Sequence, residues 1–124
     1  MPAGQTGLPV VRGLPPPEKQ LVVIAKLVEV TPTPSPDRIG QYRRCLAAYT
    51  YDVQQVLQGA CRERRILVAH WVIIDRRVLP VSRRVGQSYR LRLVLLDDYP
   101  QLQVERLVMT QDEVHLPLYY DTGS

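Results

Sequence analysis

The sequence predicts a small all-β barrel, and three observations lead to that prediction. Residues 49–75 read as two strands, rich in β-branched and aromatic side chains, on either side of a turn at Gly59. Four or five such segments of about 6–12 residues alternate with turns rich in Gly, Pro and Asp. The 124 residues suffice for one domain with a buried core, and long strands are expected to curl because a flat sheet would leave one face uncovered.

The chain is expected to begin with a Pro-rich extended arm or linker over residues 1–20, followed by one barrel domain over residues 21–124. Five prolines disfavour regular structure in the arm. Residues 21–30 are apolar at odd and even positions alike, except for two charged side chains, which favours a strand buried on both faces. Periodicity alone does not distinguish this strand from a short helix. Residues 31–40 carry prolines at alternate positions and are expected to form a loop, because proline cannot donate to a strand ladder.

The next two strands are the best supported. Residues 46–57 have apolar or aromatic side chains at most odd positions and polar ones at several even positions, which predicts one buried and one wet face. Residues 58–60 turn the chain into a third strand, residues 65–74, whose two apolar faces predict a central place in the sheet. Residues 75–85 are expected to form a basic connection.

The last third of the chain is expected to add two strands. A fourth strand follows the turn at Gly86, and its expected inward side consists of Tyr89, Leu91, Leu93 and Leu95. Residues 101–110 are left open between a short helix capped by Asp98 and an irregular excursion. Residues 114–120 are expected to form the last strand, and Pro117 predicts that it lies at an edge of the sheet, where a partner could add a strand.

The net charge of +4 conceals an uneven distribution. Residues 1–96 hold 15 Lys or Arg against 6 Asp or Glu, a balance of +9, whereas residues 97–124 have a balance of −5. The acidic tail is expected to fold back on the basic barrel and neutralise it. The alternative is a basic surface that faces an anionic partner, and arginine, which supplies 14 of the 16 positive charges, suits bidentate contacts with carboxylate or phosphate.

The strongest lead to a binding site is a set of arginines in turns and on one strand face. The candidate ligand-binding residues are Arg62, Arg64, Arg65, Trp71, Arg76, Arg77, Arg83, Arg84, Arg90 and Arg92. In a barrel, exposed strand faces and loops are the usual ligand surface. Trp71 offers a ring on which a nucleic-acid base could stack beside an arginine.

The sequence carries no catalytic, cofactor or metal signature. His70 is expected to be a hydrogen-bonded histidine of the core or rim, and with His115 as the only other histidine no zinc site is predicted. Cys61 has no neighbouring base in the sequence that would activate its thiol as a nucleophile. Asp97 and Asp98 are neighbours that would point to opposite sides of an extended chain, which does not suit an acid–base pair. We therefore expect no enzyme, no cofactor and no metal.

The two cysteines, Cys45 and Cys61, are expected not to pair. An extended chain of this length spans about 50 Å, whereas a disulfide needs Cα atoms within about 7 Å. No segment is apolar and long enough to suggest a signal peptide or a membrane span. The compartment stays open, with a bacterial cell-envelope or extracellular location favoured if an export signal has been removed.

The order of strand, loop, strand and turn carries a resemblance. Its motif residues are Tyr51, Val53, Val56 and Gly59, with Gln58 in the usual place of a lysine. Residues 21–74 resemble the netrin-like and metalloproteinase-inhibitor-like modules, which implies a five-stranded OB-type barrel that serves as a non-catalytic binding or accessory module, often on secreted or envelope proteins. Those modules usually carry several disulfides, and the animal inhibitors begin with a metal-reaching cysteine. This chain has neither feature, so protease inhibition is not implied.

Three functional hypotheses follow. The first is a non-enzymatic binding or assembly module that engages a protein or an acidic glycan through arginine loops around residues 76–84 and an exposed edge strand. The second is a nucleic-acid-binding OB-fold domain, whose affinity would fall steeply with salt. The third is an enzyme of unrecognised type.

Overall fold

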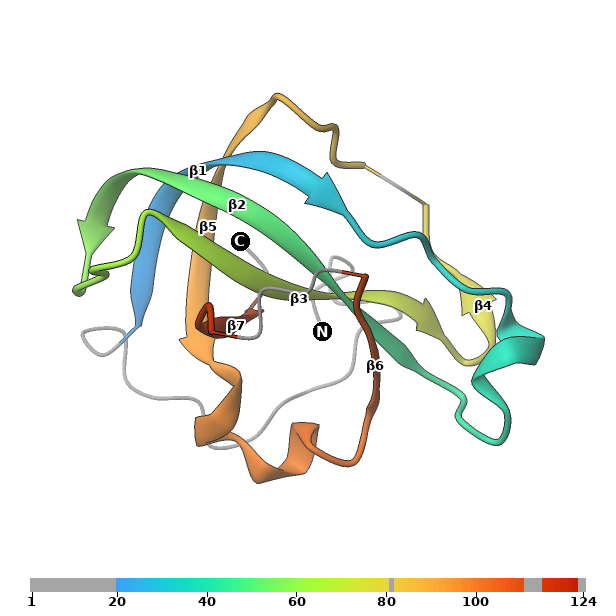
Figure 1. Ribbon diagram of the computed structural model, residues 1–124. Coiled ribbons are helices and arrows are strands. Elements are labelled where there is room, and N and C mark those ends of the chain that lie inside the picture. The colour runs from blue at the N-terminus through green and yellow to red at the C-terminus, as the bar shows by residue number, and fades with distance from the viewer. Residues whose placement is uncertain (1–19, 81, 111–114, 123–124) are drawn as a thin grey trace, which may run out of the picture.

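Five strands curl into a closed barrel in the computed structural model of the chain, which describes residues 20–80, 82–110 and 115–122 (Figure 1). The barrel strands are β1 (Leu21–Val30), β2 (Cys45–Gln58), β3 (Arg65–Ile74), β5 (Ser88–Leu95) and β7 (Leu118–Asp121). They pair in the order β1–β2–β3–β7–β5, and β5 returns to β1. Only the β3–β7 pair among these five is parallel. The predicted all-β, five-stranded OB-like barrel is confirmed.

The long strand β2 makes the barrel curl. Its first part, residues 45–52, pairs with β3, and its second part, residues 49–58, pairs with β1. Three register irregularities interrupt the β1–β2 ladder, and such bulges bend a strand and increase its twist. Two short strands lie outside the barrel. Strand β6 (Arg106–Val108) pairs with β2 beyond the end of β1, and β4 (Arg77–Val78) pairs with the far end of β3.

The chain buries two separate cores. The first fills the barrel with alternate side chains of each strand, among them Val23, Leu27, Tyr51, Val68, Leu91 and Leu93. The second lies outside the barrel wall, where the 3₁₀ turns η4 (Leu96–Asp98) and η5 (Pro100–Leu102) pack Leu96, Tyr99 and Leu102 against Leu46, Ala69 and Tyr120. The expectation that the even positions of β2 face water is therefore wrong for Thr50, which is 1% exposed, and for Leu46, which is 1% exposed in the second core. Leu95, expected inward, is 42% exposed at the rim.

The prediction that residues 114–120 form an edge strand is wrong. The strand is β7, it runs from Leu118 to Asp121, and it pairs with β3 on one side and β5 on the other. Pro117 precedes the strand, so its missing N–H costs no ladder bond, and its carbonyl accepts a hydrogen bond from the Leu67 amide. Because both edges of β7 are used, a partner cannot add a strand there. Residues 111–114 lie outside the described part of the chain.

The remaining expectations concern the arm, the cysteines and one turn. Residues 1–19, nearly all of the expected Pro-rich arm, lie outside the described residues. Cys45 is buried, Cys61 is partly exposed, and both thiols are free, as expected. The turn after β2 needs its glycine, because Gly59 has φ of 83° and an added Cβ would lie 3.1 Å from the Gln20 carbonyl oxygen.

Candidate binding site at the arginine-rich end of the barrel

The predicted arginines do not gather in one place. Arg62 and Arg64 are exposed in the β2–β3 turn at one end of the barrel. Arg90 and Arg92 are exposed on the outer face of β5, and Arg84 is exposed in the connection from β4 to β5. These five side chains therefore belong to three different surfaces.

Two further predicted arginines are already occupied by carboxylates. Arg65 forms a two-pronged pair with Asp52, at 2.8 Å and 3.3 Å, and this contact lowers the pKa of the Asp52 carboxyl. Arg83 turns inward to Asp121 at 3.3 Å, and its side chain is only 19% exposed. Neither guanidinium is available to a ligand unless its pair breaks.

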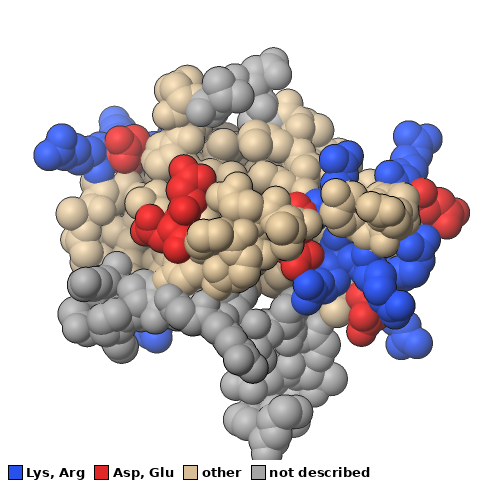
Figure 2. Space-filling model, turned by 90° about the horizontal axis from the view of Figure 1, so that it is seen from below, with Lys and Arg blue, Asp and Glu red and all other residues tan. Residues whose placement is uncertain are grey.

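Arg76 and Arg77 instead join arginines that sequence reasoning missed. Figure 2 shows Lys and Arg side chains gathered at one end of the molecule, and we call this surface the arginine-rich end. It consists of Arg38, Arg43, Arg44, Arg76, Arg77 and Arg106. The β1–β2 loop, the β3–β4 hairpin and β6 bring them together, since the Arg76 amide donates to the Arg43 carbonyl at 2.8 Å and Arg106 pairs with Cys45. Only the Arg43-Arg44 doublet, directly before a predicted strand, could have signalled the missed residues.

The β3–β4 hairpin holds Arg76 in an unusual backbone conformation. Ile74 pairs with Arg77, so Asp75 and Arg76 form a two-residue turn, and both have positive φ, 51° and 63°. This conformation is uncommon for residues other than glycine, although Asp and Asn tolerate it better than most. The Arg76 guanidinium then donates to the carbonyls of Gly40 at 3.1 Å and Tyr42 at 3.4 Å. Arg76 therefore holds the β1–β2 loop in place.

A shallow hollow of about 560 Å³ opens between these elements. Its lining consists of Gln41, Tyr42, Arg43, Arg44, Asp75 and Glu105. Arg44 forms a close ion pair with Glu105, whose side chain is 12% exposed. Arg43 lies 3.7 Å from Asp75, and both side chains are about 70% exposed. The hollow therefore contains one close pair with a largely buried carboxylate and one loose, solvated pair.

Trp71 borders the second core rather than a free binding face. The Arg44 guanidinium lies over its ring at 5.6 Å from the centroid, and its indole N–H donates to the Tyr120 hydroxyl at 2.8 Å. The Tyr120 ring also packs edge-on against it. A nucleic-acid base could stack on Trp71 only after displacing Arg44.

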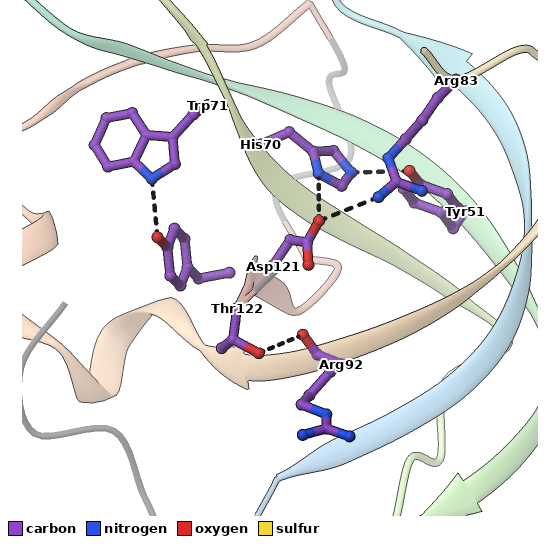
Figure 3. A network of polar contacts seen from close by, with 8 residues as sticks. Tyr51, His70, Trp71, Arg83, Arg92, Asp121 and Thr122 are labelled. Carbon is purple, nitrogen blue, oxygen red and sulfur yellow. Dashed lines mark hydrogen bonds and ion pairs between the residues drawn. The ribbon is translucent and has the colours of Figure 1, made fainter. Parts of the chain in front are cut away.

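A second polar cluster lies inside the barrel (Figure 3). His70 is 8% exposed, its Nδ1 lies 3.0 Å from Asp121, and its Nε2 lies 2.8 Å from the Tyr51 hydroxyl. A carboxylate can only accept, so Nδ1 carries the proton, and in the neutral ring Nε2 accepts from Tyr51. His70 is thus the hydrogen-bonded core histidine that the sequence predicted. Tyr51 is 0% exposed, so this contact lies within the barrel interior.

This geometry favours the neutral form of His70. Burial lowers the pKa of the imidazole below its ordinary 6.5, and the nearby Arg83 lowers it as well, whereas Asp121 raises it. Protonation would also turn Nε2 into a donor and deprive the Tyr51 hydroxyl proton of its acceptor. Burial raises the pKa of Tyr51, which stays a neutral donor. Burial also raises the pKa of Tyr49, whose ring lies 5.0 Å from the imidazole, so this residue stays neutral.

We expect the fold to lose stability as the pH falls below about 6.5, because the unfolded chain then binds a proton at His70 that the folded chain does not. The free energy of unfolding should decrease by at most about 1.4 kcal/mol per pH unit from this group, until the pH reaches the lowered folded-state pKa. Urea unfolding at about pH 7 and about pH 5 measures the loss. A His70→Gln variant should lose less between the two conditions, and an equal loss in both proteins would assign the effect to other groups.

The other residues considered for catalysis or metal binding do not form a site together. Burial raises the pKa of the Cys61 thiol, and Asp97 and Asp98 belong to the short turn η4. Within the described residues no three His, Cys, Asp or Glu side chains lie close enough to hold a metal ion. Two acidic residues of the C-terminal part pair with arginines, Glu105 with Arg44 and Asp121 with Arg83, whereas Asp112 and Glu113 lie outside the described residues.

Comparison of the chain with protein-family models, curated proteins and solved structures finds no match. No helix in the described ranges is sufficiently long and apolar to cross a membrane.

Proposed function

We propose that the chain is a non-enzymatic binding or assembly module that engages an acidic protein or an acidic glycan through the arginine-rich end. One observation supports this most directly: arginines of the β1–β2 loop, the β3–β4 hairpin and β6 meet at one end of the barrel. Among the described residues, no carboxylate forms an ion pair with Arg38, Arg77 or Arg106. The resemblance to netrin-like accessory modules is part of the same proposal.

The strength of such a surface depends on several contacts made together. One exposed ion pair contributes at most about 1 kcal/mol, whereas micromolar binding requires about 8 kcal/mol. Arginine favours such cooperation because its planar group makes two parallel bonds to one carboxylate. The anchoring of the β1–β2 loop by Arg76 supports the proposal further, because a fixed loop loses less entropy when a ligand binds.

A nucleic-acid-binding domain is the alternative. One observation favours it: OB-type barrels bind oligonucleotides with the loop between their first two strands, and that loop carries Arg38 and Arg43 here. Two observations weigh against it. Arg44 covers Trp71, and the second core covers the outer face around Leu46 and Ala69, so the usual base-stacking face is occupied.

Neutralising two arginines of this surface should weaken binding of an acidic probe by about tenfold. The variant is Arg43→Gln with Arg77→Gln, and the control is Arg62→Gln with Arg64→Gln, which changes the net charge equally at the opposite end. Fluorescence anisotropy with labelled hexaglutamate, a heparin oligosaccharide and an oligothymidylate measures affinity over a range of salt. Equal losses in both double variants would reject the arginine-rich end as the site. Tightest binding of the oligothymidylate, with a log–log salt slope near −0.7 per contact, would favour the alternative.

A further inference from the structure

The hollow at the arginine-rich end is balanced in charge, although the surface around it is positive. Its lining holds two arginines and two carboxylates, Arg43 and Arg44 with Asp75 and Glu105. A site built only to attract anions would not place two carboxylates among its cations. The two acidic side chains therefore need an explanation of their own.

The two ion pairs of the hollow differ in how firmly they are held. Glu105 is 12% exposed and in close contact with Arg44, which also lies over the Trp71 ring. Breaking this pair would strand a nearly buried carboxylate, so a ligand should leave it in place. Asp75 and Arg43 lie 3.7 Å apart with side chains 73% and 70% exposed, and exposed pairs of this kind are weak. Arg43 is thus the cation of the hollow that a ligand can take over at small cost.

We propose that an acidic side chain of a protein partner displaces Asp75 from Arg43, so that Asp75 acts as a built-in competitor for the site. This inference rests on the proposed function and names the chemical group that is bound. The displaced and incoming groups are both carboxylates, so the exchange preserves the charge at Arg43. Asp75 then turns to solvent, which its exposure already permits.

The charge pattern favours a protein segment over a polyanion. A phosphorylated or sulfated chain would bring several negative charges against the carboxylates of Asp75 and Glu105, which repel them. A flexible peptide can turn one carboxylate toward Arg43 and its other acidic side chains toward solvent, and protein interfaces commonly match charges of both signs. Gln41 and Tyr42 supply the neutral part of the lining, with Tyr42 40% exposed.

Position 75 allows a precise test because its backbone favours asparagine. With φ of 51°, Asp75 occupies a left-handed conformation in which Asn is at least as well tolerated as Asp. Asp75→Asn therefore removes the charge and keeps both the side-chain shape and the turn. Asp97→Asn makes the same chemical change in η4, at a residue that does not line the hollow, and controls for net charge.

The experiment compares the affinities of these variants for labelled hexaglutamate by fluorescence anisotropy at low ionic strength. Asp75→Asn should bind about threefold more tightly than Asp97→Asn, as expected for removing one like charge within several ångströms of the bound group. In an Arg43→Gln background this gain in affinity should disappear, because Asp75 then has no arginine for which it competes with the ligand. Thermal unfolding of each variant checks that the fold is intact.

The outcomes separate this inference from the proposed function. Absence of hexaglutamate binding to the unchanged protein would reject both. Binding that Arg43→Gln with Arg77→Gln weakens, but that Asp75→Asn improves no more than Asp97→Asn, would overturn the competitor role alone. The competitor role would also be overturned if Asp75→Asn improved hexaglutamate affinity equally in the Arg43→Gln background. That result would show that Asp75 repels the ligand in general and does not compete for Arg43. Tighter binding of a heparin oligosaccharide than of hexaglutamate would overturn the assignment of a protein partner.

Discussion

Removal of residues 118–124 should leave a chain that no longer unfolds cooperatively. This deletion removes β7, the strand that joins β3 to β5 and closes the barrel. Tyr119 leaves the first core and Tyr120 leaves the second, and both are at most 7% exposed in the intact fold. Each lost aromatic side chain removes about 2–3 kcal/mol of burial. The two unpaired strand edges add a further cost, so the total approaches the 5–15 kcal/mol that typically stabilises a domain of roughly this size.

The measurement is circular dichroism during heating, with the full-length chain for comparison. The shortened chain should show no sigmoidal transition and should aggregate, because the exposed edges of β3 and β5 can pair with other copies. A synthetic peptide of residues 115–124 added in trans should restore the transition, whereas a scrambled peptide should not. A cooperative transition of the shortened chain near the full-length temperature would show that the barrel is stable without β7.

Local sequence patterns were sufficient for the strands that dominate the barrel. The predicted ranges 21–30 and 65–74 coincide with β1 and β3, because their apolar runs are long and end at a proline-rich loop after β1 and at charged residues on both sides of β3. The parallel pairing of β7 with β3 was not predictable in this way. It joins residues about fifty positions apart, and no local period reveals which distant strand becomes a neighbour.

The position of Pro117 illustrates the same limit. Proline disfavours the interior of a strand only at its own residue, and here the strand begins one residue later, at Leu118. The restriction holds at position 117 itself and does not extend to the residues that follow it. A hydrogen bond to the Pro117 carbonyl shows that this backbone still participates in the barrel wall.

The candidate site was harder to predict than the fold. Arg76 and Arg77 were identified from sequence, but their neighbours Arg38, Arg43 and Arg106 come from a loop and a strand that are distant in sequence. The second core, which packs beside Trp71, also depends on residues that are distant in sequence. Leu46 and Leu96 occupy positions where outward polar residues would be expected, and such outward apolar residues could have indicated the second core.

Replacing Asp121 by alanine should destabilise the barrel by about 3–5 kcal/mol, because it removes one member of a buried charged cluster. The Asp121 carboxylate, 11% exposed, accepts from His70 and from Arg83, whose guanidinium also lies over the Tyr89 ring at 4.9 Å. Alanine leaves the Arg83 cation without this carboxylate and the His70 Nδ1–H without this acceptor. Urea unfolding at neutral pH measures the change in the free energy of unfolding.

The matched control is Asp52→Ala, which removes the carboxylate partner of Arg65 at the surface. The side chains of that pair are 44% and 42% exposed, so the loss should stay below about 1 kcal/mol. Adding Arg83→Met to Asp121→Ala should recover part of the stability, because methionine fills similar space without leaving a buried cation. Two results would show that Asp121 and Arg83 are not energetically coupled. One is a loss of stability in Asp121→Ala no larger than in Asp52→Ala. The other is a double variant whose loss equals the sum of the losses of Asp121→Ala and Arg83→Met measured separately. The barrel interior would then depend on its apolar packing and on the His70–Tyr51 contact alone.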